Sequence, residues 1–369
     1  MVEKKLTYES SGVDYQRIDP LKVLAQQAAR TTGINLEGTG VNEIADSRGE
    51  SAYVVDIGEA YIASITECLG TKSLVADALR NITERTWYEN IAQDTIATAI
   101  NDIITVGAQP LSIHAYWAAG SSTWFEDQER MADLVKGWKS ACDYLGVAWG
   151  GGETPCLTGI VEENAIDLAA SCVGIIRPKS RLTLGNNLSP GDAIVLLESS
   201  GIHANGLTLA RKLAERLPEG YATPISDGRM YGEALLDPTL LYAPITQAVF
   251  EAGINLKYIA NITGHGWRKI MRHQKEITYR ITKLPPVPEV LKFIIEETQE
   301  TPEEAYCSLN MGAGFALFVG AEHAQKTISC AQANGVSAWV AGYLEDGPRK
   351  VVIEPLEMTL ESESLALRD

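Results

Sequence analysis

The sequence has no excess of basic residues, no closely spaced cysteine pair and no long apolar run. Its 31 Lys and Arg residues stand against 48 Asp and Glu residues, a formal net charge of −17. Nucleic acids and anionic membrane surfaces bind clustered positive charge, so we expect neither as a partner. No segment approaches the ~18 uninterrupted apolar residues of a membrane span, and no apolar run follows the charged start, so we expect a cytoplasmic protein.

Three kinds of catalytic or metal-binding pattern are also missing. The six cysteines form no C-x-x-C pair, which disfavours a zinc ribbon or a dithiol redox site. The phosphate-binding pattern G-x-x-x-x-G-K-[ST] is absent, and no Ser/His/Asp or Cys/His arrangement typical of a nucleophile is visible. We therefore expect reduced thiols and a chemistry without a side-chain nucleophile.

The periodicity of apolar residues predicts a mixed α/β chain. Residues 53–66 favour two paired strands joined near Gly58, and residues 90–106 place isoleucines at helical spacing up to Gly107. Asp94 then falls in the first turn of that helix, and strands are expected at 112–119 and before the glycines that start at Gly150.

The pattern starts again after a polar segment, residues 177–191, which contains Pro178, Pro190 and Gly191. A chain of 369 residues with 45% hydrophobic residues is long enough for two cores. We therefore predict two domains, residues 1–176 and 177–369.

A first candidate site follows the strand that ends near Glu67. Gly70, Thr71 and Lys72 combine a flexible backbone, a hydroxyl and a cation, which together can neutralise a phosphate. A solvated lysine in a turn is the alternative.

A second candidate lies on the predicted helix 90–106. Asp94 and Asn101 are seven residues apart, so their side chains share one face of the helix. Asp94 alone is explained by helix capping, but Asp102 lies among apolar residues and needs a partner, for which a hydrated metal ion is one candidate.

Glycine-rich turns give two more candidates. After Gly150, the segment Gly151-Gly152-Glu153-Thr154 can form an anion-binding nest beside a cation ligand, although glycine runs are more often simple turns. Residues 199–206 join a strand to a helix, with Asn205 as a possible cap and His203 as either a substrate contact or an inert turn residue. Thr263-Gly264-His265-Gly266 repeats this arrangement.

Taken in order, these segments resemble the aminoimidazole ribonucleotide synthetase family, also called phosphoribosylformylglycinamidine cyclo-ligase. The resemblance runs from about Tyr8 to Ile353. Its motifs are Tyr8-x-x-x-Gly12-Val13-Asp14, Gly70-Thr71-Lys72, Asp94-Thr95-Ile96, Asn101-Asp102, Gly151-Gly152-Glu153-Thr154, Ser199-Ser200-Gly201-x-His203-x-Asn205-Gly206, Thr263-Gly264-x-Gly266 and Asn310-Met311-Gly312-x-Gly314.

The resemblance implies a fold, a partner and a reaction. The N-terminal halves of two subunits are expected to form a barrel-like homodimer that binds ATP and Mg²⁺ at its interface, with an α/β C-terminal half packed against each. The implied reaction converts formylglycinamidine ribonucleotide, a phosphorylated small molecule, to aminoimidazole ribonucleotide, with release of ADP and phosphate, in purine biosynthesis.

The resemblance also implies residue roles. Expected catalytic residues are Lys72, Asp94 and His203. Expected metal ligands are Glu67, Asp94 and Glu153, and expected nucleotide-binding residues are Glu67, Gly70, Thr71, Lys72, Asp94, Asn101, Asp102, Gly151, Gly152, Glu153 and Thr154. Expected substrate-binding residues are Ser200, Gly201, His203, Asn205, Thr263 and Gly264.

Departures from the family pattern lie mainly on the substrate side. Pro155-Cys156-Leu157-Thr158 replaces a segment with a second acid, Asn261 and His265 replace His and Gly, and Cys307-Ser308 replaces Arg-Thr. Two alternatives therefore stay open: an enzyme of the same superfamily that phosphorylates a different amide or small molecule, and a nucleotide-binding protein without turnover.

Overall fold

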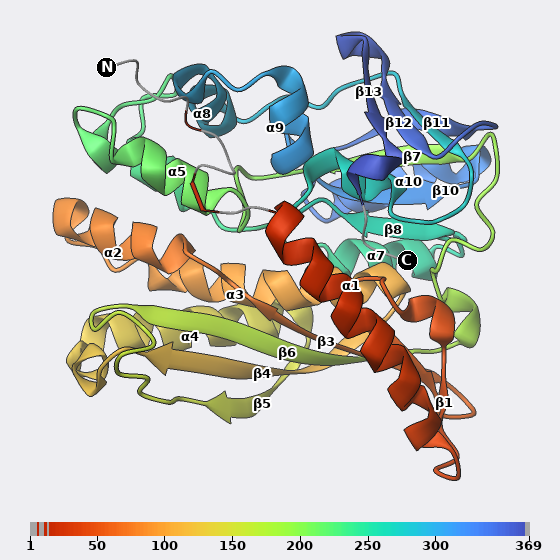
Figure 1. Cartoon of the computed structure of the whole chain (residues 1–369), viewed down its shortest axis with the longest axis horizontal. Coiled ribbons are helices and arrows are strands. Elements are labelled where there is room, and N and C mark those ends of the chain that lie inside the picture. The colour runs from red at the N-terminus through yellow and green to blue at the C-terminus, as the bar shows by residue number, and fades with distance from the viewer. Residues whose placement is uncertain (1–5, 7–10, 13–14, 366–369) are drawn as a thin grey trace.

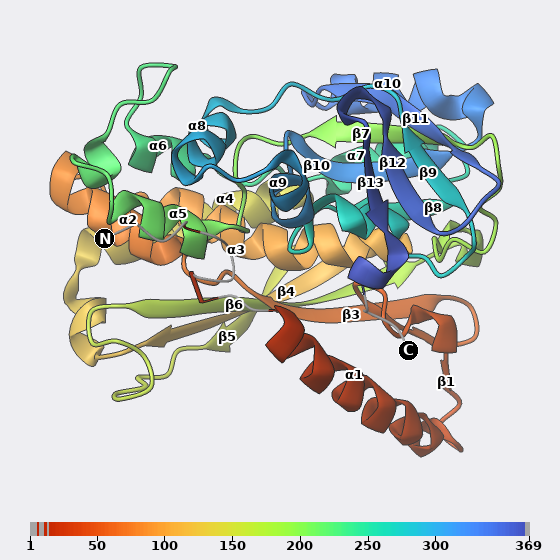
Figure 2. The ribbon, with the colours of Figure 1, turned by 45° about the horizontal axis from the view of Figure 1, so that its top comes forward.

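Two β-sheets, one from each half of the chain, lie on either side of a long central helix in the computed structural model (Figures 1 and 2). The structure describes residues 6, 11–12 and 15–365. Of the motif that spans residues 8–14, only Ser11 and Gly12 are among them. No helix within the described ranges is both long and apolar enough to cross a membrane.

The first sheet has the strand order β1-β2-β3-β6-β4-β5. Only β4 and β5 are parallel; the other neighbours are antiparallel. Its strands are β1 (Asn42–Glu43), β2 (Tyr53–Asp56), β3 (Tyr61–Cys68), β4 (Gln109–Ala119), β5 (Ala148–Glu153) and β6 (Ile166–Ile176).

Four α-helices belong to the first half: α1 (Tyr15–Thr31), α2 (Lys72–Thr83), α3 (Tyr88–Ile103) and α4 (Gln128–Leu145). In Figure 2, α2, α3 and α4 lie on one side of β3, β6 and β4, whereas α1 lies on the other side. On β6 the residues that face the helices are buried and most of those between them are partly exposed, as alternation on a half-covered strand requires.

The second sheet has the order β13-β12-β9-β11-β7-β10-β8. Only β12 and β9 are parallel. Its strands are β7 (Ala193–Glu198), β8 (Tyr258–Asn261), β9 (Thr278–Ile281), β10 (Ala313–Val319), β11 (Ala338–Glu345), β12 (Lys350–Ile353) and β13 (Met358–Glu361). In the sequence, residues 177–192 therefore separate the described strands of the first sheet from those of the second.

The second half adds six α-helices within the described residues: α5 (Leu207–Ala214), α6 (Tyr231–Leu235), α7 (Ala243–Glu251), α8 (Glu289–Thr298), α9 (Pro302–Ser308) and α10 (Ala324–Ala333). A short 3₁₀ helix, η7 (Gly266–Met271), follows β8. All seven residues of β10 are buried, which explains its continuous apolar run.

Helix α3 is the central helix, and its apolar positions are buried. The helix predicted at 90–106 is confirmed as α3 followed by a 3₁₀ turn, Ile104–Val106, which ends at Gly107 with φ +83°. A Cβ at Gly107 would lie 1.8 Å from the carbonyl oxygen of Arg181, so only glycine fits. Because α3 begins at Tyr88, Asp94 lies in its second turn; its placement in the first turn was wrong.

The strand pair predicted at 53–66 is confirmed as β2 and β3. The glycines that start at Gly150 were expected in a turn after a strand. This expectation was wrong, because they lie within β5. A Cβ at Gly152 would lie 2.2 Å from the carbonyl oxygen of Ala115 on β4. Close approach of two strands, and not a phosphate-binding turn, therefore explains glycine at this position.

Candidate functional site

A cavity of about 400 Å³ lies between the two halves of the chain, and we call it the charged cavity. Acidic side chains from the first half, Glu50, Glu67 and Asp102, line it together with Lys269 and Arg272 from the second half. Opposite charges therefore meet across the boundary between the halves.

Five residues predicted from the sequence line the charged cavity: Glu67, Asp102, Asn205, Thr263 and Gly264. Glu67 is the penultimate residue of strand β3, and Asp102 is near the end of α3. The other three residues follow strands of the second sheet. The fold thus gathers acids and hydroxyl or amide groups that are far apart in the chain.

Glu67 has a strongly perturbed carboxyl group. Burial, and then the nearby charge of Asp102, raise the pKa of Glu67 to about 7, although Lys269 and Arg272 oppose this shift. Within residues 15–365 its carboxylate forms neither a hydrogen bond nor an ion pair within 4.0 Å. A carboxylate at Glu67 is therefore favoured when a cation binds beside it and offsets the neighbouring negative charge.

The donor set fits Mg²⁺, which proteins commonly hold through one or two carboxylates while phosphates and water complete the octahedron. One carboxylate oxygen of Asp102 accepts a hydrogen bond from the Asn261 amide at 2.7 Å, and Asp102 lines the cavity together with Glu67. No group of three or more His, Cys, Asp or Glu side chains suited to a metal occurs among the described residues. Glu67 and Asp102 are two carboxylates of the charged cavity whose chemistry fits such a site.

The basic side of the cavity comes from η7. In a 3₁₀ helix side chains three residues apart lie on the same side, so Lys269 and Arg272 project together. On another side of this helix Trp267 and Ile270 are fully buried, and the Trp267 indole donates to the Asn310 carbonyl oxygen at 2.8 Å. Packing of Trp267 and Ile270 in the core thus orients η7 so that Lys269 and Arg272 line the same cavity as the acidic side chains.

Helix α1 borders the same cavity through Lys22 and Gln26. One turn earlier, Asp19 lies 3.4 Å from Nε2 of His265, which also lines the cavity. Burial, with the charges of Arg268 and Lys269, lowers the pKa of His265 to about 4, so this contact is a hydrogen bond to a neutral imidazole near pH 7.

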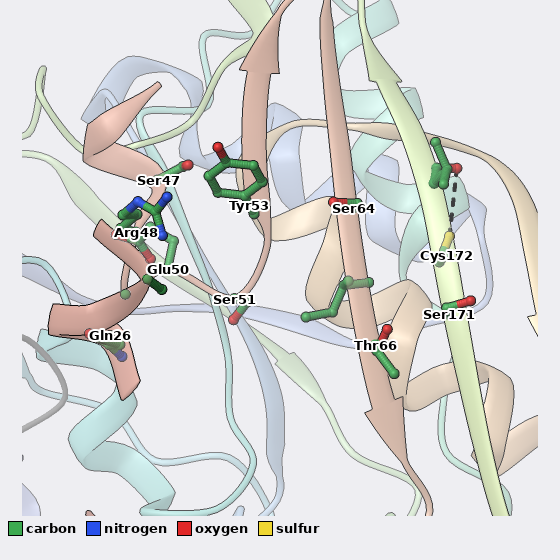
Figure 3. A pocket seen from close by; sticks show the side chains of 14 residues that line it. Gln26, Ser47, Arg48, Glu50, Ser51, Tyr53, Ser64, Thr66, Ser171 and Cys172 are labelled. Atoms are coloured by element: carbon green, nitrogen blue, oxygen red, sulfur yellow. Dashed lines mark hydrogen bonds between the residues drawn. The ribbon is translucent and has the colours of Figure 1, made fainter. Parts of the chain in front are cut away.

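A second cavity of about 450 Å³ adjoins the first and shares Gln26, Glu50, Ser51 and Ile65 with it. We call it the hydroxyl-lined cavity. Figure 3 shows Ser64 and Thr66 on β3 and Ser171 on β6 along one wall, with Tyr53, Arg48 and Gln26 across from them.

Lys72 and Asp94 form a buried ion pair, with 2.8 Å between Nζ and Oδ2 and no exposure of either side chain. Lys72 also donates to the Asp237 carbonyl oxygen at 2.9 Å, and the Thr239 backbone N–H donates to Asp94 at 2.8 Å. Burial raises the pKa of Asp94 against the opposing effects of Lys72 and Thr239. Both charges thus have partners within the protein, and neither side chain lines the charged cavity.

Asn101 shares that face of α3 with Asp94, as predicted. Its amide donates to the Leu240 carbonyl oxygen at 2.8 Å and accepts from the Tyr242 backbone N–H at 3.1 Å. The polar groups on this face therefore find their partners in residues 237–242 of the second half and not in a metal ion.

His203 lies in the core of the second half. Its Nε2 accepts the Ser200 backbone N–H at 3.1 Å, and burial lowers its pKa to about 3. Ser200 donates its hydroxyl to the Pro238 carbonyl oxygen at 2.6 Å. His203, Ser200 and Gly201 do not line the charged cavity, and the neutral, buried imidazole of His203 is hydrogen-bonded within its own turn.

The predicted metal trio is not assembled within one chain. Glu67 is paired with Ala170, Ala170 with Ala115, and Ala115 with Gly152, so three strand spacings, about 14 Å, separate Glu67 from the neighbourhood of Glu153. Gly151, Gly152, Glu153 and Thr154 are exposed, and neither they nor Gly70 and Thr71 line the charged cavity.

Lys269, Arg272, Lys22 and Glu50 are site residues that the sequence patterns did not single out. A basic pair at spacing three, directly after Thr263-Gly264-His265-Gly266, is the signal that points to the first two.

Two family models match the chain. The N-terminal domain of AIR synthase related proteins matches residues 49–176, and the corresponding C-terminal domain matches residues 189–354. The chain belongs to the AIR synthase related family. Within that family, a phosphoribosylformylglycinamidine cyclo-ligase of Methanococcus maripaludis strain C6 is 31% identical over 344 residues, 92% of this chain and 93% of the relative. One of Carboxydothermus hydrogenoformans is 32% identical over 360 residues, 95% and 99% of the two chains.

Solved structures share the fold of this family member. AaThiL complexed with AMPPCP and TMP has a TM-score of 0.60 at 14% identity and covers 92% of this chain and 94% of its own. T. maritima PurL complexed with ATP has a TM-score of 0.56 at 16% identity, over 86% of this chain and 47% of its own.

Replacing Asp94 tests the buried ion pair of this AIR synthase related protein. Asp94→Asn leaves the Lys72 ammonium buried without its counter-charge, so we expect a loss of about 3–5 kcal/mol in the free energy of unfolding, measured by urea denaturation. The matched control is Asp143→Asn, which removes an exposed pair with Lys139 and should cost less than about 0.5 kcal/mol. Equal losses in the two variants would contradict the assignment.

Glu67 makes stability depend on pH. Its folded pKa of about 7 lies above the unfolded value of about 4.5, so the folded state holds the extra proton and loses stability as pH rises between these values. The stability of Glu67→Gln relative to the original protein should therefore grow by up to about 3 kcal/mol from pH 4.5 to pH 8, without divalent cations. Exposed Glu153→Gln should show no such change; a pH-independent difference for Glu67→Gln would refute the shift.

Proposed function

We propose that the chain is an ATP-dependent cyclo-ligase that converts formylglycinamidine ribonucleotide to aminoimidazole ribonucleotide, with release of ADP and phosphate, in purine biosynthesis. The observation that carries this proposal is the identity of 31–32% to proteins named phosphoribosylformylglycinamidine cyclo-ligase over more than nine-tenths of both chains. Because the similarity covers nearly the whole length of both chains, it supports an activity that uses both halves and not merely one domain in common.

We place ATP across the two adjoining cavities. The charged cavity offers Lys269 and Arg272 for phosphate groups, while the hydroxyl-lined cavity offers the Tyr53 ring and several hydroxyls to a base and ribose. Because the cavities share Gln26 and Glu50, one extended ligand can occupy both. The triphosphate then points toward the boundary between the halves.

Glu67 and Asp102 would hold Mg²⁺ on the acidic side of the charged cavity. When bound there, Mg²⁺ supplies positive charge that neutralises the phosphates and the two carboxylates together. Near pH 7 the raised pKa of Glu67 means that cation binding also displaces a proton from this carboxyl group.

The substrate would lie on the side of Asn205, Thr263 and Gly264. The formyl oxygen takes the γ-phosphoryl group of ATP and ADP leaves; an amidine nitrogen then attacks the activated carbon, and the ring closes with loss of phosphate. Phosphoryl transfer of this kind depends on positioning and charge neutralisation and needs no side-chain nucleophile. The Asn205 amide and the Thr263 hydroxyl are suited to orient the formyl and amidine groups.

We also propose a homodimer through the face of the first sheet opposite to α3. Ile62, Ser171, Val173 and Ile175 lie on this face and are partly exposed, and all of β5 is exposed. Of the described elements only α1 lies on this side (Figure 2). A second copy would cover this surface and bring another β5 toward the hydroxyl-lined cavity.

The proposed reaction is tested with purified protein, ATP, MgCl₂ and formylglycinamidine ribonucleotide, by colorimetric detection of the aminoimidazole product. Product should form only with Mg²⁺ present, and Glu67→Gln should lower kcat/KM about 100-fold or more, because a metal ligand is lost. Exposed Glu296→Gln on α8 is the matched control and should retain activity. ADP release without the aminoimidazole would reject the cyclo-ligase and indicate a different acceptor.

The proposed homodimer is tested by light scattering after gel filtration. The chain should elute with twice the mass of 40.0 kDa, and Ile175→Lys should shift it to the monomer mass, because a buried charge is placed in the interface. Ile160→Lys changes an 82% exposed side chain on a loop and should leave the dimer intact. A monomer for the original protein would refute the proposal.

A further inference from the structure

Lys269 differs from the other cations of the charged cavity in the contacts of its ammonium group. Within residues 15–365 its Nζ makes neither a hydrogen bond nor an ion pair within 4.0 Å. Arg272, on the same side of η7, is bonded to the first half through two of its nitrogens: its Nε donates to the Gly49 carbonyl oxygen at 2.9 Å and its Nη1 to the Ser51 hydroxyl at 2.7 Å. Arg272 thus fixes η7 across the cavity and leaves Lys269 facing into it.

The surroundings of Lys269 disfavour its charge in the absence of a ligand. Burial, and then the neighbouring charge of Arg272, lower the pKa of Lys269 to about 8, while Asp102 and Glu67 only partly oppose this. A half-buried ammonium without a hydrogen-bond acceptor costs folding free energy. An anion in the cavity would remove that cost.

The arrangement also restricts which anion fits. A simple carboxylate near Lys269 would meet repulsion from Glu67 and Asp102 on the opposite side of the cavity. A phosphoryl group that shares a divalent cation with these acids avoids that repulsion, since the cation faces the carboxylates and the phosphoryl oxygens face the ammonium. Both sides of the cavity are then neutralised by one ligand.

We propose that Lys269 is a phosphoryl-binding residue, whose ammonium donates hydrogen bonds to oxygens of a phosphoryl group in the charged cavity. The inference rests on the proposed function for the identity of its ligands. Two phosphoryl groups have the required chemistry: the γ-phosphoryl group of ATP and the phosphate ester of the ribonucleotide substrate. The experiment separates them.

The first measurement compares the thermal unfolding of Lys269→Met with that of Lys283→Met, which changes an exposed lysine of the same half. Without ligand, Lys269→Met should unfold at the same temperature as the original protein or higher, because an uncompensated charge is removed. A purely structural lysine would give the opposite result, a clear loss of stability, and that loss would overturn the proposal.

The second measurement is calorimetric binding with MgCl₂, using AMPPCP, ADP and formylglycinamidine ribonucleotide as separate probes. If Lys269 holds the γ-phosphoryl group, Lys269→Met should weaken AMPPCP about tenfold or more and leave ADP unchanged within twofold. If it holds the substrate phosphate, the same loss should appear only for the ribonucleotide. Lys269→Arg should recover part of the lost affinity, and Lys283→Met should bind all three probes normally.

The outcomes separate this inference from the proposed function. Weakened binding of one phosphorylated probe in a chain without cyclo-ligase activity would support the phosphoryl site and reject the cyclo-ligase. Unchanged binding of every probe in Lys269→Met, in a chain that makes aminoimidazole ribonucleotide, would reject the inference and leave the function standing. If the original protein binds none of the probes, the phosphoryl site is refuted.

Discussion

The ion pair between Lys72 and Asp94 is the interaction on which the joining of the two halves depends. Both groups are fully buried, and each completes its hydrogen bonding with backbone of residues 237–239 in the second half. A buried ammonium and carboxylate are tolerable only when both are present and hydrogen-bonded. The pair therefore requires the second half to dock on α3 in one register, and that register sets the position of η7 opposite Glu67.

The charged cavity follows from this register. Its acids belong to β3, α3 and the segment before β2, whereas Lys269 and Arg272 belong to η7. Neither half alone has a site for a phosphorylated ligand and its cation, because each contributes mainly one sign of charge. The net charge of −17 is no obstacle to an anionic ligand, since exposed charges are screened beyond roughly 8 Å at physiological salt.

Elements with strong periodicity could be predicted from the sequence. The helix 90–106, its end at Gly107 and the strand pair at 53–66 follow from local spacing and backbone sterics, and the structure has all three. The roles of Asp94, Asn101 and His203 could not be predicted in this way, because their partners lie far away in the chain. The sequence alone does not distinguish a carboxylate that pairs with a lysine from one that binds a metal ion.

The glycines beginning at Gly150 show the same limit. A run of glycines indicates that backbone comes close to something, but not whether that is a phosphate or the neighbouring strand β4. Asp102 was found because an acid in an apolar context needs a partner wherever the chain folds, whereas Glu67 was found through the family resemblance. Lys269 was missed because the basic pair at spacing three does not show by itself which of its two cations lacks a partner in the fold.

The contacts of α3 have a consequence for how the chain acquires its site. Asp94 and Thr239 are 145 residues apart, and Asn101 and Tyr242 are 141 apart, so the halves are joined by contacts of long sequence separation. Such contacts form slowly, because a long stretch of chain must be ordered before they are gained. During synthesis Lys72 and Asp94 leave the ribosome before residues 237–239, which supply the acceptor and the donor that complete this pair. Ligand binding is then the last property to appear, and it reports on complete docking of the two halves.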